Sequence, residues 1–357
     1  MSAARPPELA NEGARPPGGE RREASSRGDP TTTQPLLDVR GLTVEFPTRR
    51  GTLTAVRDVT FAIAPGEVLG VVGESGAGKS LTGSAIIGLI DPPGRIAAGE
   101  IHLGGRRIDN LPYEAMRRLR GREIGAVFQD PLTSLNPLYT IGRQLIETIR
   151  THLPLTEGSA RKRAIGLLEE VGIPAAERRI DHYPHQFSGG MRQRVVIALA
   201  LAVNPRLIVA DEPTTALDVS IQSQIIQLLK RLTREHGTAV MLVTHDMGVI
   251  AETADRVAVM YAGRIVEIGP VGDVIHRARH PYTVGLMGSI PSIVEERERL
   301  AQIDGTMPRL TAIPPGCAFH PRCPRMTQHC ASERPRLETA GRTEAACWNP
   351  VPADARP

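Results

Sequence analysis

Short apolar runs, each followed by glycine or polar residues, recur along the chain. Three of them, at 68–72, 207–210 and 239–243, contain almost no polar position. Runs of this length and uniformity predict strands buried on both faces of a parallel sheet, with helices between them. The stretch 36–63 alternates apolar and polar positions instead, which predicts half-exposed strands. With a mainly helical region over 137–177, the pattern indicates an α/β fold.

A glycine-rich loop follows the first buried strand and leads into a predicted helix. Its sequence over 73–80, GESGAGKS, fits the GxxxxGK[ST] pattern of a phosphate cradle, in which backbone N–H groups and a helix N-terminus face an anion. We expect Lys79 to reach the β- and γ-phosphates and the Ser80 hydroxyl to bind Mg²⁺. The residues assigned to nucleotide binding here are Gly73, Glu74, Ser75, Gly76, Ala77, Gly78, Lys79, Ser80 and Leu81.

Ionisable residues follow the other two buried strands. Asp211 and Glu212 come directly after one strand, and His245 comes shortly after the other. In parallel sheets ligand chemistry collects at the carboxyl ends of strands. We therefore expect Asp211 to hold Mg²⁺, Glu212 to polarise a water for attack on the γ-phosphate, and His245 to contact that phosphate. Gln129, in the loop 127–131, is expected to reach the metal or the water.

A second predicted anion site opens the helix that begins near residue 189. Ser188, Gly189 and Gly190 offer a hydroxyl and free N–H groups at its start. With the phosphate loop and the strand-end residues, this set resembles the ATP-binding-cassette (ABC) superfamily over about 37–269. The usual signature Leu and Gln are replaced here by Phe187 and Met191.

The resemblance implies further roles and an architecture. It makes Asp218 part of the D-loop and puts Phe46 where the family stacks an aromatic ring on adenine. It also implies a P-loop ATPase domain over 36–284 with a RecA-like core, a β-subdomain and a helical subdomain at about 130–195. The implied cofactors are ATP and Mg²⁺.

Three stretches narrow the resemblance. Residues 127–137, 210–222 and 279–283 look like the ATPase subunits of oligopeptide and dipeptide importers. That family implies a second ATPase subunit, two membrane permeases, and a binding protein that delivers the substrate. ATP would lie between the phosphate loop of one subunit and the signature of the other, at the cytoplasmic face of the membrane. Import of nickel complexes or another small solute, and a non-transport ABC ATPase, are the alternatives.

All four cysteines, Cys317, Cys323, Cys330 and Cys347, lie in a C-terminal extension over 285–357. A reducing cytosol disfavours disulfides, and the close spacing usual for zinc ligands is missing. Cys323-Pro324 resembles the Cys-Pro of cluster loops, and the stretch 316–323 is similar to importer ATPases that hold a [4Fe–4S] cluster. We expect such a cluster, with a Cys₄ zinc site or reduced thiols as alternatives, and a structural or docking role rather than ATP chemistry.

Composition limits the remaining possibilities. The net charge of +4 and the aromatic content of 3% give no support for nucleic-acid binding. Residues 1–35 are rich in Pro, Gly and Arg and predict a disordered tail, because they can bury little apolar surface. We find no signal-peptide pattern and no apolar run of membrane-spanning length. The span 80–210 carries no heptad run, which argues against a coiled-coil DNA-repair ATPase.

Overall fold

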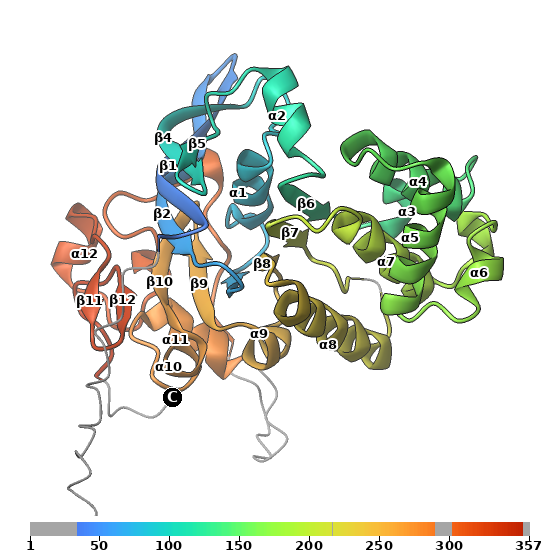
Figure 1. The fold of residues 1–357 in the computed structure, drawn as a ribbon. Helices are drawn as coiled ribbons and strands as arrows, with labels where there is room; N and C mark the ends of the chain where they lie inside the picture. Colours follow the sequence, from blue (N-terminus) through green and yellow to red (C-terminus); the bar gives the residue numbers. More distant parts are fainter. Residues whose placement is uncertain (1–33, 216, 290–301, 353–357) are drawn as a thin grey trace, which may run out of the picture. The chain divides into compact units, whose positions relative to one another are not determined.

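A computed structural model describes residues 34–215, 217–289 and 302–352. Most of the predicted N-terminal tail lies outside these residues, as does Ala216, which the resemblance places with Leu217 and Asp218 in the D-loop. The described chain forms two sheets and a group of helices (Figure 1). The two sheets confirm the α/β class expected from the hydrophobic pattern.

The larger sheet has eight strands in the order β11-β12-β10-β9-β3-β8-β7-β6. Its parallel part contains β3, β6, β7, β8 and β9, and the predicted apolar runs are β3, β7 and β8. Every residue of β3 and β8 is buried, as expected for strands with both faces covered. The strand bounds are β3 (Val68–Val72), β6 (Ile124–Val127), β7 (Leu207–Asp211), β8 (Ala239–Val243), β9 (Arg256–Tyr261), β10 (Arg264–Pro270), β11 (Glu338–Ala340) and β12 (Thr343–Ala345).

The C-terminal residues are part of this sheet. Strand β12 pairs with β10, and β11 pairs with β12, all antiparallel. This pairing could not be predicted from the sequence, because both strands are three residues long and rich in polar side chains. Residues 338–345 therefore share a sheet with β3, the strand before the predicted phosphate loop.

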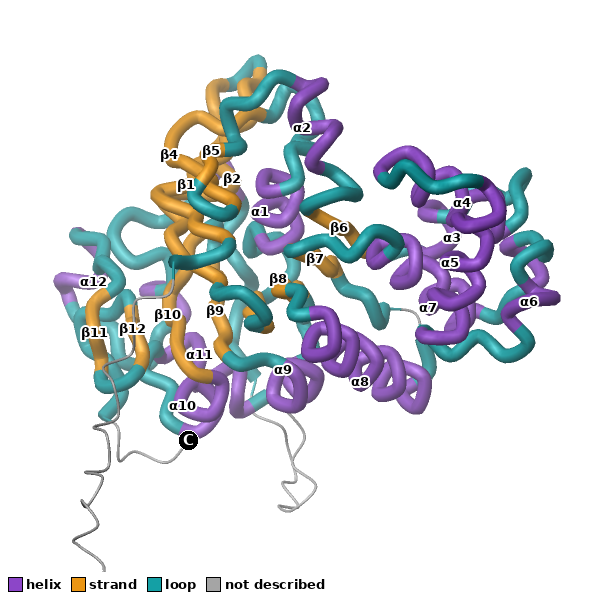
Figure 2. The backbone as a smooth tube through the Cα atoms, in the orientation of Figure 1, coloured by secondary structure: helices purple, strands orange, loops and turns teal. Residues whose placement is uncertain are grey.

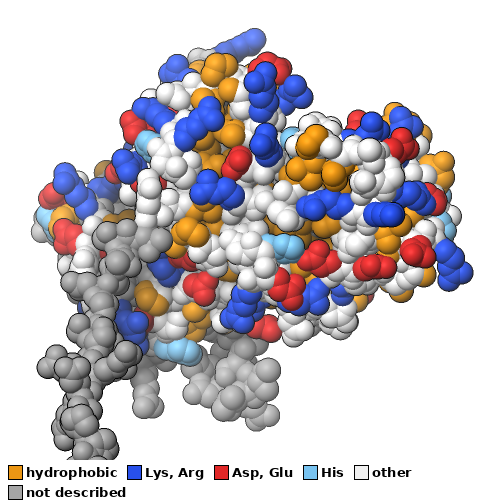
Figure 3. Space-filling view, in the orientation of Figure 1, with side chains coloured by type: hydrophobic (Ala, Val, Ile, Leu, Met, Phe, Trp, Pro, Cys, Tyr) orange, Lys and Arg blue, Asp and Glu red, His pale blue; other side chains and the backbone are white. Residues whose placement is uncertain are grey.

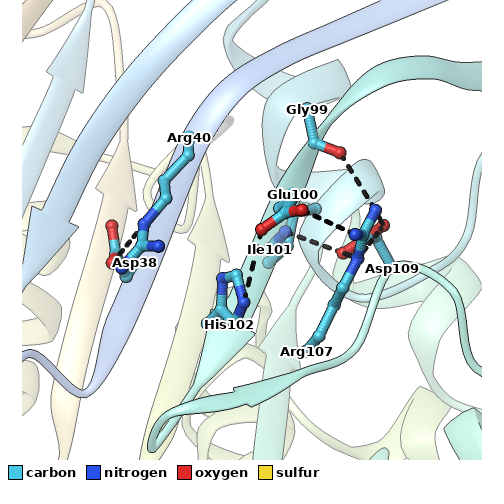
Figure 4. A network of polar contacts seen from close by, with 8 residues as sticks. All are labelled: Asp38, Arg40, Gly99, Glu100, Ile101, His102, Arg107 and Asp109. Atoms are coloured by element: carbon cyan, nitrogen blue, oxygen red, sulfur yellow. Dashed lines mark hydrogen bonds and ion pairs between the residues drawn. The ribbon is translucent and has the colours of Figure 1, made fainter.

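The smaller sheet is antiparallel, with the order β2-β1-β4-β5. Its strands are β1 (Leu37–Thr48), β2 (Gly51–Ile63), β4 (Arg95–Leu103) and β5 (Arg106–Arg107). A polar network fastens the β4–β5 turn (Figure 4). In it, the Arg107 guanidinium donates to Glu100 at 2.6 Å and to Asp109 at 2.9 Å, and Asp109 also accepts the N–H of Ile101.

The helices α3–α7 gather beyond the β6 edge of the main sheet (Figure 2). Side chains cap four of them. The Asp130 carboxylate accepts an N–H group of α3, and the hydroxyls of Thr140, Thr156 and Ser188 accept N–H groups of the first turns of α4, α5 and α7. The helix bounds are α1 (Lys79–Ile86), α2 (Tyr113–Leu119), α3 (Pro131–Ser134), α4 (Ile141–His152), α5 (Glu157–Glu170), α6 (Ala176–Arg179), α7 (Gly189–Leu201), α8 (Val219–His236), α9 (Met247–Thr253), α10 (Val271–His276), α11 (Pro281–Gly288) and α12 (Gln328–Ser332). None of the described helices is long and apolar enough to cross a membrane.

Candidate nucleotide site

The loop between β3 and α1 forms a cradle around its own lysine. Lys79 Nζ donates to the carbonyls of Gly73 at 2.9 Å and Glu74 at 3.1 Å. Gly73 has a φ of 149°, and a Cβ there would lie 2.2 Å from the carbonyl oxygen of Met260, so only glycine fits. Burial lowers the pKa of Lys79, and the nearby carboxylates of Glu212 and Asp211 partly oppose this. The loop thus holds a buried ammonium group at the N-terminus of α1, whose first residue is Lys79.

The predicted magnesium ligands lie side by side. Ser80 Oγ donates a hydrogen bond to Asp211 Oδ1 at 2.9 Å. A hydroxyl beside a carboxylate is a set of hard oxygen donors that suits Mg²⁺, so these two residues fit the expected ion. Burial raises the pKa of Asp211, while the bond from Ser80 lowers it in part.

Glu212 is the centre of a contact network. Its Oε1 lies 3.3 Å from His245 Nδ1, and its Oε2 accepts from Gln129 Nε2 at 3.3 Å and from Thr215 Oγ1 at 2.8 Å. Burial alone would raise the pKa of Glu212, but the bonds from Thr215 and His245 lower it overall. The carboxylate is therefore ionised at neutral pH.

The backbone at Glu212 is strained. Its φ of 47° is in the left-handed region, and its N–H is held by the carbonyl of Val243 in β8 at 2.8 Å. This conformation turns the chain at the end of β7, so the carboxylates of Asp211 and Glu212 serve different partners. Thr215 was missed in the sequence, although it lies inside the quoted stretch 210–222.

These residues line one open cavity of about 690 Å³. It includes Phe46, at the place expected for adenine, and Leu310 from the C-terminal residues, which the sequence did not indicate. The predicted residues that line it are Phe46, Ser75, Gly76, Gly78, Lys79, Ser80, Leu81, Gln129, Glu212 and His245. Asp211 joins them through its bond to Ser80.

The signature residues lie apart from this cavity. Ser188 caps α7, and a Cβ on Gly190 would lie 2.7 Å from Cγ2 of Ile221 in α8. Asp218 is exposed at the N-terminus of α8. The cavity that contains Lys79 is lined by none of these residues: Ser188, Gly189, Gly190 and Asp218. Within one chain, the two predicted anion sites are therefore separate.

The opposite side of the phosphate loop is held by C-terminal residues. Arg322 Nη1 contacts both carboxylate oxygens of Glu74, at 3.0 and 3.1 Å. The N–H of Glu74 donates to the hydroxyl of Tyr282 at 3.0 Å. Tyr282 belongs to the importer-like stretch 279–283, whereas no pattern in the sequence singles out Arg322. The extension, expected to stay apart from ATP chemistry, touches the loop directly.

The four cysteines converge. Cys317, Cys323, Cys330 and Cys347 all line one small enclosed cavity beside Phe319. Burial raises the pKa of the Cys317 and Cys323 thiols, and that of Cys347 to about 11. Among the described residues, however, no three His, Cys, Asp or Glu side chains stand close enough together to hold a single metal ion. Neither the expected iron–sulfur cluster nor the alternative zinc site is therefore supported by a group of closely spaced metal ligands.

Comparisons with known proteins agree with the site. Residues 56–215 match the family model described as ABC transporter, and residues 266–330 match the model described as oligopeptide/dipeptide transporter, C-terminal region. The chain is 45% identical over 323 residues to the dipeptide transport ATP-binding protein DppD of Escherichia coli K12, with 90% of this chain and 99% of that protein covered. It is 51% identical over 286 residues to the oligopeptide transport ATP-binding protein OppD of Bacillus subtilis 168, with 80% of each chain covered.

A solved structure is also similar. It is described as a dimeric, post-hydrolysis state of the ATP-binding cassette MJ0796 bound to ADP and Pi. The TM-score is 0.60 at 31% identity, over 66% of this chain and 98% of that one. About a third of this chain is therefore not covered by that structure.

Proposed function

This chain belongs to the ABC transporter family of ATP-hydrolysing proteins, and on that premise we propose that it is the subunit that drives peptide import. The observation that carries the proposal is the convergence of Lys79, Ser80, Gln129, Glu212 and His245 on one cavity. The names of the relatives, dipeptide and oligopeptide transport ATP-binding proteins, supply the substrate class. Import of nickel complexes or another small solute is the alternative that uses the same cassette.

Each polar group in the cavity has a task in ATP hydrolysis. Lys79 contacts the β- and γ-phosphates, and Ser80 and Asp211 hold Mg²⁺, which when bound neutralises charge on the phosphate oxygens. Ionised Glu212 orients the attacking water and accepts its proton. His245 is well placed to exchange its contact with Glu212 for one with the γ-phosphate, because its side chain is 64% exposed. Phe46 packs against the base.

A second ATPase subunit completes the site in this proposal. Ser188, Gly189 and Gly190 do not face the cavity of their own chain, and free N–H groups at a helix start suit a phosphate. The similar cassette MJ0796 was solved as a dimer. The signature of one subunit would thus cover the ATP held by the phosphate loop of the other, with Asp218 at the interface.

The membrane permeases would dock beside Gln129. Phe128, Leu132 and Leu138 are 44%, 61% and 78% exposed, which is unusual for large apolar side chains so near one another in sequence. Figure 3 shows hydrophobic side chains gathered on the helical part of the visible face. An apolar helix of a permease would bury such side chains and keep the ATPase at the cytoplasmic face of the membrane. A substrate-binding protein would act only through the permeases.

The domain plan is also part of the proposal. Residues 36–284 form the ATPase domain, 285–357 form the peptide-importer extension, and its four cysteines hold a [4Fe–4S] cluster. In such a cluster each thiolate would bind a different iron, so the four sulfurs would stand further apart than around one zinc ion. The convergence of the four cysteines on one cavity supports it.

Transport by the assembled complex tests the function. The chain, co-purified with its permeases and placed in liposomes, should take up labelled di- or oligopeptides when ATP is present. The Glu212→Gln protein should not do so. Uptake of a nickel complex without peptide uptake would replace the substrate class, and ATPase activity without any associated permease would contradict the transport role.

Elemental analysis tests the cluster. Protein purified without oxygen should contain about four irons per chain and absorb broadly near ~400 nm. Cys323→Ser should lower the iron content. One zinc without iron would assign a Cys₄ zinc site, and the absence of both metals would leave four reduced thiols.

A further inference from the structure

Glu74 is fixed at three points, each by a different part of the chain. Its N–H donates to Tyr282 of α11, its carbonyl accepts from Lys79, and its carboxylate binds Arg322. Glu74 is the second residue of the phosphate loop, directly after Gly73, whose carbonyl also accepts from Lys79. Any movement of Glu74 therefore moves a carbonyl that positions the lysine ammonium.

Arg322 is buried and fully engaged. Its side chain is 8% exposed. Besides Glu74, it donates to the Tyr261 hydroxyl at 3.3 Å and, through Nε and Nη2, to backbone carbonyls at 2.8 to 3.4 Å. Those carbonyls belong to the segment before it in the chain, at Ile303, Asp304 and Gly305. A guanidinium held on all its edges has one orientation, so it can hold Glu74 in place.

Arg322 is anchored in the cysteine-lined region. The next residue is Cys323, and Phe319 packs against Tyr261 and Tyr282 with ring centroids 5.3 and 5.4 Å apart. Phe319 is 2% exposed, and it lines the cavity of the four cysteines. The same aromatic group thus supports Arg322 and the tyrosine that holds the N–H of Glu74.

We propose that Arg322 is a positioning residue for ATP binding, which holds the phosphate loop through Glu74 and makes the C-terminal region part of the nucleotide site. The inference depends on ATP binding at this loop, as proposed above. Arg322 does not line the cavity of Lys79, so its removal should lower ATP affinity without changing which residues carry out hydrolysis. Coupling is reciprocal, so bound ATP should in turn stabilise the segment around Arg322.

Calorimetric titration with ATP of Arg322→Gln measures the coupling. We expect the Kd for ATP to rise at least fivefold, the lower end of typical coupling between sites, with kcat changed less than KM. The Kd of Arg322→Lys should lie between those of Arg322→Gln and the unaltered protein, because lysine keeps the positive charge but lacks the planar guanidinium with its several donors.

Arg325→Gln is the matched control. Arg325 lies in the same region and donates to Asn349 at 3.1 and 3.3 Å, with no contact to the phosphate loop. Its Kd for ATP should stay within about twofold of the unaltered protein. An equal loss of affinity in Arg325→Gln would assign Arg322 a merely structural role and overturn the proposal.

A double-mutant cycle and hydrogen exchange separate the outcomes. Arg322→Gln combined with Glu74→Gln should weaken ATP binding no more than the stronger single change, whereas additive losses would overturn the proposal. ATP should slow amide exchange over 316–331 in the unaltered protein but not in Arg322→Gln. Failure of the unaltered protein to bind ATP would instead refute the proposed function, while tight ATP binding by a folded Arg322→Gln protein would refute this inference alone.

Discussion

The two sides of the phosphate loop are held in different ways. On the side of the strand ends, Ser80 donates to Asp211 and His245 contacts Glu212. Ser80, Glu212 and His245 line an open cavity, and the His245 side chain is 64% exposed. On the other side, Arg322 is 8% exposed and bound on every edge. The first side is arranged to exchange its partners when a ligand enters, whereas the second is arranged to keep them. Changes on the first side should therefore affect chemistry, and changes on the second should affect affinity and stability.

Glu212→Gln is the strongest test of the side at the strand ends, where hydrolysis is expected to occur. The amide keeps the size of the side chain but loses the ionised oxygen that accepts a proton, so we expect ATP hydrolysis to fall about 10²–10⁴-fold. ATP binding should persist, and the protein should accumulate as an ATP-bound dimer in light scattering. Glu235→Gln, on the exposed face of α8 beside Arg231, is the control and should leave the rate unchanged. A near-normal rate in Glu212→Gln would place the base elsewhere.

Lys79→Ala should be the next largest change. It removes a buried ammonium whose bonds to phosphate are charge-assisted, which costs about 1.5–3 kcal/mol and raises the Kd for ATP about 10–100-fold. Isothermal calorimetry measures the loss, and circular dichroism checks the fold. Lys162→Ala, an exposed lysine on α5, is the control. Unaltered ATP binding by folded Lys79→Ala would exclude the loop as the phosphate site.

The side at the strand ends could be predicted from the sequence because its residues lie close in the chain to the strands that position them. Each predicted run, such as 239–243, is a buried strand, and the first of the residues assigned to the site follows it by one or two positions. Strand ends in a parallel sheet meet at one edge, so adjacency in space follows from position in the chain. Thr215 was not predicted as a site residue, because a threonine in a turn has many ordinary structural roles.

The opposite side could not be predicted because its contacts are long-range. Arg322 lies 248 positions from Glu74, and an arginine in the sequence His-Pro-Arg-Cys looks like a surface residue. Strands β11 and β12 carry no hydrophobic period and depend on pairing with β10. Side-chain partners of this kind are set by the packed structure and not by local pattern.

Gly316→Ala tests the side of the phosphate loop that is held by Arg322 and its neighbours. Gly316 has a φ of 67°, and a Cβ there would lie 2.3 Å from the carbonyl oxygen of Cys330. Gly341, with a φ of 80° and nothing within 4 Å, is a matched control that shares the backbone strain but not the overlap. We expect Gly316→Ala to lower the free energy of unfolding about 1–3 kcal/mol more than Gly341→Ala. Equal losses in denaturant titrations would show that the cysteine-lined region adapts freely.

Acidification should produce the smallest effect, and it separates the two neighbouring carboxylates. Burial raises the pKa of Asp211, whereas the pKa of Glu212 is lowered overall. As the pH falls, a proton therefore occupies Asp211 at a higher pH than it would an ordinary aspartate, whose pKa is about 3.9, and it competes with Mg²⁺. As the pH rises through that pKa, the carboxylate is freed and Mg²⁺ binding is restored.

The affinity for Mg²⁺-ATP should thus weaken on acidification by at most about tenfold per pH unit. Asp211→Asn cannot take up this proton, so its weaker binding should lack this part of the pH dependence. The nucleotide titrates equally in both experiments, and the difference between the two curves isolates Asp211. Calorimetry at neutral and acidic pH gives that difference, and parallel curves for the two proteins would show that protonation of Asp211 does not weaken Mg²⁺ binding. Glu212→Gln should retain the slope of the unaltered protein, because Glu212 stays ionised across this range.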